Sequence, residues 1–274
     1  MGAAVIADRP DLSQRTGLSK SALNTADMCG QKGWLELHHR APWIGNPDMT
    51  FGSCVDAGAE LAIGYARSGQ PPELDRMIAA AEEIALRDQI EVHPEEVELA
   101  LTRFVLDVLP QRDWRFARTQ AHIHVPLLDW GDVDGHPDII LPGEVLDIKT
   151  SKRSKDTART VELGLYALMV EEDTGKPVER VGYVTWVRRK TPAWEVMMAE
   201  VTDDLRAWTI ERVSAYVRAV RADELLNRNA AEPVNWTFPA GPKNAGLCAS
   251  CQYHPKFDPP WPCRMAAMEE TTNV

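Results

Sequence analysis

Two aspartates and a lysine near the middle of the chain have the types and spacing of a metal-dependent hydrolytic site. Asp138 ends a Gly-His-Pro-Asp motif, and Asp147 and Lys149 lie two residues apart in the segment 144–150. Residues i and i+2 of a strand project to the same face, so Asp147 and Lys149 should point the same way. If the strands on either side of the Pro-Gly turn at 142–143 pair, Asp138 and Asp147 converge on one point.

Two carboxylates on a rigid sheet are hard oxygen ligands that suit Mg²⁺ or Mn²⁺. A lysine beside the metal can orient a water molecule or stabilise charge that develops on a phosphate. For an isolated Asp-x-Lys, a weak surface ion pair is the simpler interpretation. However, Asp147 stands among Val145, Leu146 and Ile148, which predicts its burial. A buried charge is costly unless it is paired or binds metal, so the sequence favours a metal site.

The elements that must position these residues alternate between helices and strands. Helices are predicted over 18 to beyond 34, 51–66, 73–89, 95–109, 157–172 and 203–227, with Ser19 and Asp203 as N-caps. Strands are predicted at 120–128, 131–141, 144–150, 178–188 and 193–201. Residues 41–50 carry two prolines and a glycine, which predicts a loop. The pattern indicates one α/β core that follows a helical region.

This order suggests four consecutive parts within one compact unit. We expect a leader at 1–17, a helical N-terminal part at 18–118, an α/β core at 119–228 and a cysteine-rich tail at 229–274. The 274 residues are enough to bury a core without disulfides. No run of 18 apolar residues and no basic, apolar leader is present, so we expect a cytoplasmic protein.

The formal net charge of −11 argues against a generic nucleic-acid coat protein, which would usually be basic. It does not exclude an enzyme that meets DNA through a local basic strip. Lys152, Arg153 and Lys155 follow the strand of Asp147, and Arg188 and Arg189 begin a second basic group. These cations could neutralise phosphates near a cleavage site, although either group could equally be a solvated turn.

Some aromatic residues could also contact bases. Most of the nine tryptophans are expected in the core, and a few could stack on single-strand bases. His122 and His124 lie two residues apart and share one face of a predicted strand. That spacing permits a metal site, but it favours two paired histidines in the core.

The five cysteines are odd in number, and the chain has no export signal, so a disulfide framework is a poor interpretation. Cys248, Cys251 and Cys263 cluster near the C-terminus, which suggests a metal or cluster site. With His254 they would form a local zinc site, whereas with Cys29 an all-thiolate site would suit zinc or an iron–sulfur cluster. Cys54 has no such neighbour and is expected in the core.

These residues together resemble the PD-(D/E)XK nuclease superfamily, specifically its RecB-like branch with CRISPR-associated and phage exonucleases. Pro137-Asp138 and Asp147-Ile148-Lys149 match the metal and lysine motif. Tyr166 fits the tyrosine of a Gln-x-x-x-Tyr helix motif, but Glu162 replaces the glutamine. Asp56 stands where the branch has a histidine, and Glu60 lies one helical turn further on.

The resemblance implies a restriction-endonuclease-like fold with a central mixed sheet. It implies that Asp56, Asp138, Asp147 and the Ile148 carbonyl bind Mg²⁺ or Mn²⁺, with Glu60 as a supporting group. Lys149 would position the attacking water, and Glu162 and Tyr166 would steady the lysine or the scissile phosphate. The branch also has one early and three late cysteines that hold a [4Fe–4S] cluster, which implies the ligand set Cys29, Cys248, Cys251 and Cys263.

The implied activity is hydrolysis of DNA by an exonuclease that acts in recombination, repair or end processing. The substrate would be single-stranded DNA or DNA ends, and recombination or CRISPR-adaptation proteins would be the partners. The alternative is a DNA-binding or assembly factor that keeps the fold and the cluster but cuts little. The departures at Glu162 and Asp56 favour that alternative, whereas the intact Asp138, Asp147 and Lys149 favour the enzyme.

Overall fold

The structure is a computed structural model that describes residues 46–227 and eight earlier positions: Leu18, Ser19, Ala22, Leu23, Thr25, Cys29, Lys32 and Gly33. Its contacts divide the chain into two compact units. The catalytic unit, as we name it for the predicted site that it contains, comprises residues 45–125 and 135–209. The flanking unit comprises residues 1–44, 126–134 and 210–274.

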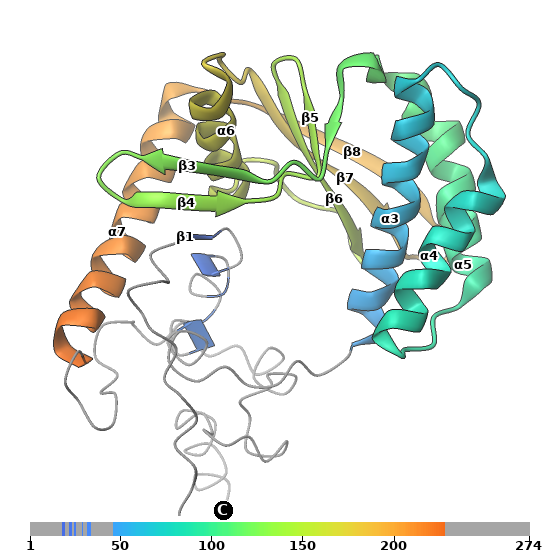
Figure 1. The fold of residues 1–274 in the computed structure, drawn as a ribbon, viewed down its shortest axis with the longest axis horizontal. Coiled ribbons are helices and arrows are strands. Elements are labelled where there is room, and N and C mark those ends of the chain that lie inside the picture. The colour runs from blue at the N-terminus through green and yellow to red at the C-terminus, as the bar shows by residue number, and fades with distance from the viewer. Residues whose placement is uncertain are drawn as a thin grey trace, which may run out of the picture. The chain divides into compact units, whose positions relative to one another are not determined.

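A five-stranded mixed sheet of order β2-β5-β6-β7-β8 runs through the catalytic unit (Figure 1). Its strands are β2 (Arg118–Thr119), β5 (Ile139–Leu141), β6 (Glu144–Ser151), β7 (Arg180–Val187) and β8 (Ala193–Glu200). β6 and β7 pair in parallel along their whole length, and the other neighbours are antiparallel. The helix α6 (Val161–Thr174) connects the parallel pair, because such a connection must cross back over the sheet. This arrangement confirms the predicted α/β fold with a central mixed sheet.

Three helices, α3 (Pro47–Arg67), α4 (Leu74–Asp88) and α5 (Pro94–Arg103), pack together beside the sheet (Figure 1). Their apolar side chains join those of the sheet in one core, which includes Phe51, Ile63, Leu101, Phe104, Leu146, Ile148 and Trp186. Leu146 and Ile148 of β6 point into this core. By strand alternation, Asp147 and Lys149 point to the opposite face, where α6 lies. The fold therefore turns Asp147 and Lys149 away from this apolar core.

The first helix of the catalytic unit begins earlier than the sequence predicted. α3 starts at Pro47 within the segment that was expected to be a loop at 41–50. The Asn46 side chain caps it by accepting a hydrogen bond from the Asp48 backbone N–H at 2.9 Å. Asparagine is a preferred N-cap, and proline suits the first helical position. The proline that suggested a loop is therefore part of a helix start.

The helix predicted at 95–109 does not continue as one α-helix. α5 ends at Arg103 and is followed by the π-helical η2 (Phe104–Val108) and the 3-10 turn η3 (Leu109–Gln111). A second 3-10 turn, η4 (Trp114–Phe116), leads to β2. Pro110 has no N–H to donate to the preceding turn, which explains why regular hydrogen bonding stops there.

The strand predicted at 131–141 is two strands in the structure. β4 (Gly131–Gly135) ends before β5 begins at Ile139, and residues 136–138 connect them without strand pairing. Pro137 cannot donate a ladder hydrogen bond, so the proline in the motif interrupts the strand. The interruption leaves Asp138 at the start of β5, where its side chain is partly exposed.

β1 (Leu18–Ser19) pairs in parallel with β4, in a second sheet of order β1-β4-β3 that also contains β3 (Ile123–Leu127). Leu18 is therefore in a strand and not in the predicted helix, although the Ser19 hydroxyl still accepts a hydrogen bond from the Ala22 N–H at 3.2 Å. α7 spans Asp203–Asn227, as predicted. No helix in the described part of the chain is long and apolar enough to cross a membrane.

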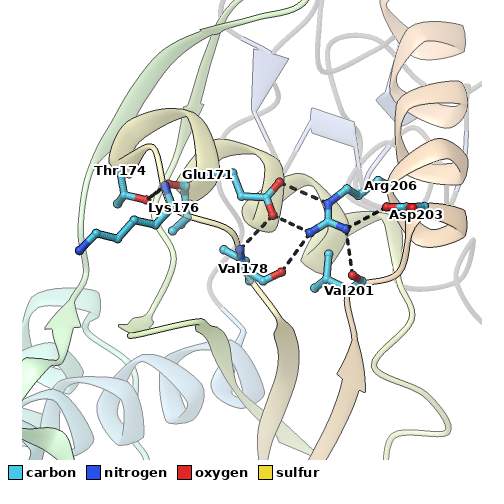
Figure 2. A network of polar contacts seen from close by, with 8 residues as sticks. Glu171, Thr174, Lys176, Val178, Val201, Asp203 and Arg206 are labelled. Atoms are coloured by element: carbon cyan, nitrogen blue, oxygen red, sulfur yellow. Dashed lines mark hydrogen bonds and ion pairs between the residues drawn. The ribbon is translucent and has the colours of Figure 1, made fainter.

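The start of α7 is tied to α6 and to the sheet by Arg206 (Figure 2). Its guanidinium donates to the Glu171 carboxylate at 2.7 Å and to the carbonyl oxygens of Val178 and Val201 at 3.2 and 3.0 Å. The Thr202 hydroxyl accepts from the Leu205 N–H, so Thr202, not the predicted Asp203, caps α7. The hydrogen bond that Arg206 donates to Glu171 raises the pKa of Arg206, so the cation persists.

We expect Arg206→Ala to lower the free energy of unfolding by about 2 kcal/mol, because each hydrogen bond to a charged group contributes roughly 1.5–3 kcal/mol. Arg206→Lys should recover little of the loss, since an ammonium cannot reproduce the planar set of donors. Urea unfolding followed by circular dichroism measures both, with Arg218→Ala, exposed on the same helix, as the control. Equal stability of all variants would contradict this role.

Candidate active site

The centre of the candidate site is an ion pair on β6. Asp147 is fully buried (0% exposed), and its Oδ2 pairs with the Lys149 ammonium, whose side chain is 29% exposed. The Lys149 Nζ also lies 3.6 Å from Oε1 of Glu162 on α6. Burial of a carboxylate is costly unless it is paired, so the lysine compensates Asp147. The structure thus brings together three of the predicted residues on one face of the sheet.

Asp138 lies beside this pair, immediately before the neighbouring strand β5. The β5–β6 register pairs Ile139 with Leu146, which places Asp138 next to Asp147 and Ile148. Its Oδ2 accepts a hydrogen bond from the Ile148 backbone N–H at 2.7 Å. Its Oδ1 accepts another from the Gln120 side chain at 3.2 Å. The carboxylate is therefore held against β6 just before β5 begins.

Glu162 is positioned by a tyrosine that sequence analysis did not identify. The Tyr183 hydroxyl on β7 donates to Glu162 Oε2 at 3.1 Å and lies 2.9 Å from the Thr160 hydroxyl. Burial, followed by the charge of Glu162, raises the pKa of Tyr183, so the phenol stays protonated and can donate. Tyr183 stands opposite Asp147 in the parallel register, but that register could not be known from sequence.

Tyr166 supports the segment before Asp138. Its buried hydroxyl donates to the His136 carbonyl oxygen at 2.9 Å. A Cβ atom at Gly135 would lie 2.7 Å from Met169 Cε and 3.1 Å from the Tyr166 ring, so glycine allows α6 to approach this closely. The described contact of the Tyr166 hydroxyl is thus with the backbone that carries Asp138, and not with Lys149.

The predicted residues Asp56 and Glu60 lie on α3, which packs across β6. A Cβ atom at Gly52 would lie 3.1 Å from Thr150 Oγ1, and Glu60 accepts a hydrogen bond from the Thr119 hydroxyl at 3.3 Å. Asp56 lies midway between Gly52 and Glu60 on the same helix face, so it is directed toward the part of the sheet that includes Ile148.

The next question is whether the acidic side chains of the described residues are grouped to bind a metal ion. Among the residues that the structure describes, no group of three or more His, Cys, Asp or Glu side chains is arranged to hold a metal ion. The predicted grouping of Asp56 with Asp138 and Asp147 around a metal ion stays a prediction. In the structure, the Ile148 N–H binds Asp138, and Lys149 pairs with Asp147.

The basic residues predicted to meet DNA are largely engaged with acidic side chains. Asp48 accepts from Lys152 at 3.1 Å and from Arg188 at 2.5 Å, and hydrogen bonding to Lys152 lowers the pKa of Asp48. Arg188 also binds both oxygens of Glu96, at 2.7 and 3.0 Å. Arg188 therefore links β7 with α3 and α5, which the sequence did not predict.

The other predicted cations have different surroundings. Arg189 pairs with Glu195 at 3.0 Å, and Lys155 Nζ lies 4.8 Å from the centre of the Tyr183 ring. Arg153 is exposed. Of these three, Lys155 is connected by this contact to the residues that surround Glu162.

The cysteines are only partly described. Cys29 is a partly exposed, reduced thiol, whereas Cys248, Cys251, Cys263 and the alternative ligand His254 lie outside the described residues. Cys54 is fully buried, which confirms its predicted place in the core. Burial raises the pKa of the Cys54 thiol to about 11, so this residue is unreactive near neutral pH.

Comparison with known proteins agrees with this geometry. The chain matches the PD-(D/E)XK nuclease superfamily over residues 17–255. Among solved structures, it is similar to a candidate exonuclease from Eubacterium rectale, with a TM-score of 0.54 and 14% sequence identity. That similarity covers 92% of this chain and 100% of the other, and at this identity it concerns the fold. No curated protein sequence matches.

Because the superfamily match spans most of the chain and agrees with the observed fold, the protein belongs to the PD-(D/E)XK nuclease superfamily. The resemblance stated from the sequence is confirmed at the level of the superfamily. Its RecB-like, iron–sulfur branch remains a prediction.

Proposed function

We propose that the protein is a Mg²⁺- or Mn²⁺-dependent DNA exonuclease that processes DNA ends in recombination or repair. The observation that carries the proposal is the buried Asp147 beside Lys149, with Asp138 held against the same strand by the Ile148 N–H. Burial of a charged pair on a sheet face is expensive unless it has a function or full compensation. Membership of a nuclease superfamily makes hydrolysis of phosphodiester bonds the chemistry that best explains it.

The residues present suit a hard divalent cation. Asp138 and Asp147 offer carboxylate oxygens on adjacent strands, and the Ile148 carbonyl and Asp56 would complete the oxygen donors. A bound Mg²⁺ or Mn²⁺ would lower the pKa of a coordinated water and polarise the scissile phosphate. Lys149 would orient the attacking water, and Glu162 would hold the lysine ammonium by the contact at 3.6 Å. Tyr166 would keep the backbone before Asp138 in place through His136.

Labelled linear and circular DNA, single- and double-stranded, tests this proposal directly in Mg²⁺, Mn²⁺ or EDTA. We expect linear DNA to be degraded progressively with either metal, and circular DNA and EDTA samples to stay intact. Cleavage of circular DNA would show that the protein is an endonuclease and not an exonuclease. Binding without cleavage in every condition would favour the alternative, a DNA-binding or assembly factor.

Tyr183→Phe should lower the turnover number about three- to tenfold and leave KM within twofold. The change removes only the hydroxyl that donates to Glu162, so Lys149 loses the precise placement of its second carboxylate partner. Loss of one hydrogen bond to a charged group is consistent with this size. Steady-state cleavage measures it, and in a Glu162→Gln background the same change should have little further effect. Additive losses in the double variant would contradict coupling through Glu162.

We further propose that Cys29, Cys248, Cys251 and Cys263 hold a [4Fe–4S] cluster. The spacing of the late cysteines and the partial exposure of Cys29 support it. Protein purified without oxygen should contain about four irons per chain. Cys29→Ser should lose them, and Cys54→Ser should not. One zinc per chain that is indifferent to Cys29→Ser would identify the alternative zinc site instead.

A further inference from the structure

Two histidines outside the proposed metal site form a stacked pair. The ring centroids of His122 and His136 are 4.6 Å apart, and the planes differ by 9°. Both residues are exposed, and so is His124. The core position predicted for His122 and His124 is therefore wrong, because His122 precedes β3 and His124 lies on the exposed face of that strand.

The two histidines stand on chain segments that are joined at Asp138. His136 precedes Asp138 by two residues, and His122 follows Gln120 by two. Gln120 is bound to Asp138 twice, through its side chain at 3.2 Å and through its backbone N–H to the Asp138 carbonyl at 3.1 Å. These bonds hold together the two short segments that carry His122 and His136.

The backbone that carries His136 is also held in place. Tyr166 binds the His136 carbonyl at 2.9 Å, and Pro137 restricts the backbone between His136 and Asp138. An aromatic group that is already ordered loses little conformational entropy when a ligand stacks on it. Two parallel, exposed rings beside a hydrolytic site therefore have the properties of a prepared stacking surface.

We propose that the His122–His136 pair is a platform on which an unpaired nucleobase of the substrate stacks next to the scissile phosphate. Histidine rings stack on the faces of unpaired bases, and such stacking tolerates any base. Lys152 and Arg188 are already paired with Asp48, so in this acidic protein stacking would supply affinity that the two cations do not. Because a base must be unpaired to stack, the platform selects single-stranded or frayed ends.

This inference rests on the proposed function, because it assigns a subsite to the same substrate. The test is fluorescence anisotropy of a labelled single-stranded DNA octamer in EDTA, where no metal bridges the histidines to DNA. Each octamer carries one abasic site, which moves along the series. The variants are His122→Ala, His136→Ala and His122→Phe, with His93→Ala, an exposed histidine before α5, as the matched control.

We expect His122→Ala and His136→Ala to weaken binding roughly tenfold, as for loss of one base–aromatic stack. His122→Phe should bind within twofold of the parent, and His93→Ala should be unchanged. With the abasic site at one position of the octamer, the His122→Ala effect should disappear. An undiminished effect at every abasic position, equal binding by all variants, or failure of the parent chain to bind the octamer would overturn the platform.

Cleavage assays distinguish failure of the stacking platform from failure of the proposed nuclease function. In Mn²⁺, His122→Ala should raise KM about tenfold and leave the turnover number unchanged. A parent chain that shows the abasic-dependent histidine effect but never cuts DNA would refute the nuclease and keep the platform. A parent chain that cuts DNA normally without any histidine effect would keep the nuclease and refute the platform.

Discussion

Asp147→Asn is expected to reduce metal-dependent DNA cleavage at least about a thousandfold, a loss that corresponds to roughly 4 kcal/mol of transition-state stabilisation. The asparagine has nearly the same shape, but it removes the negative charge that a divalent cation requires. Asp147 is fully buried, so neither water nor a mobile side chain can replace it. Lys149 keeps Glu162 as a carboxylate partner at 3.6 Å, and the fold should survive.

Single-turnover rates measure this effect, and a thermal unfolding scan confirms that the variant is folded. Asp113→Asn is the matched control, because Asp113 also pairs with a basic side chain, Arg115, but lies on the exposed surface. The control should cut DNA at the parent rate. Parent-like cleavage by a folded Asp147→Asn protein would show that the site has been assigned wrongly.

Lys149→Met should lower the cleavage rate by about a hundred- to a thousandfold, the usual effect of removing one charged or hydrogen-bonding group that stabilises a transition state. Methionine retains the length of the side chain, so packing against α6 is largely kept. Lys149→Arg should restore only a small part of the rate, because its planar guanidinium cannot occupy the place of a compact ammonium between Asp147 and Glu162.

Lys152→Met is the control for this prediction, since Lys152 is an exposed lysine three residues further along, paired with Asp48. It should leave the single-turnover rate nearly unchanged, because its ammonium is already engaged by Asp48. If Lys149→Met and Lys152→Met cut equally well, the Lys149–Asp147 contact is an ordinary structural ion pair.

Several elements followed from sequence because local signals agreed with the tertiary structure. α7 has the predicted bounds, and β6 was identified by apolar residues that alternate with Asp147 and Lys149. Local signals failed at two prolines, because proline can either begin a helix or interrupt a strand. Pro47 begins a helix that was expected to be a loop, and Pro137 divides a strand that was expected to be continuous.

Only the part of the site that depends on strand alternation and on a hairpin could be predicted from the sequence. These place Asp138, Asp147 and Lys149 near one another without knowledge of the fold. The contact of Glu162 with Lys149 could be expected only through the family resemblance. Tyr183 was missed because its role depends on the parallel register of β6 and β7, which connects residues 36 positions apart. The contacts of Arg188 with Glu96 and Asp48 were missed for the same reason, because they join α3, α5 and the end of β7.

The central claim is that Asp138 and Asp147 together bind the catalytic cation, and Mn²⁺ binding followed by electron paramagnetic resonance tests it most directly. Titration of the chain with Mn²⁺, with and without a noncleavable DNA, counts the bound ions. We expect one or two bound ions in the parent and in Lys149→Met, and a loss of binding of at least tenfold in both Asp138→Asn and Asp147→Asn. Unchanged Mn²⁺ binding by the two asparagine variants would contradict it.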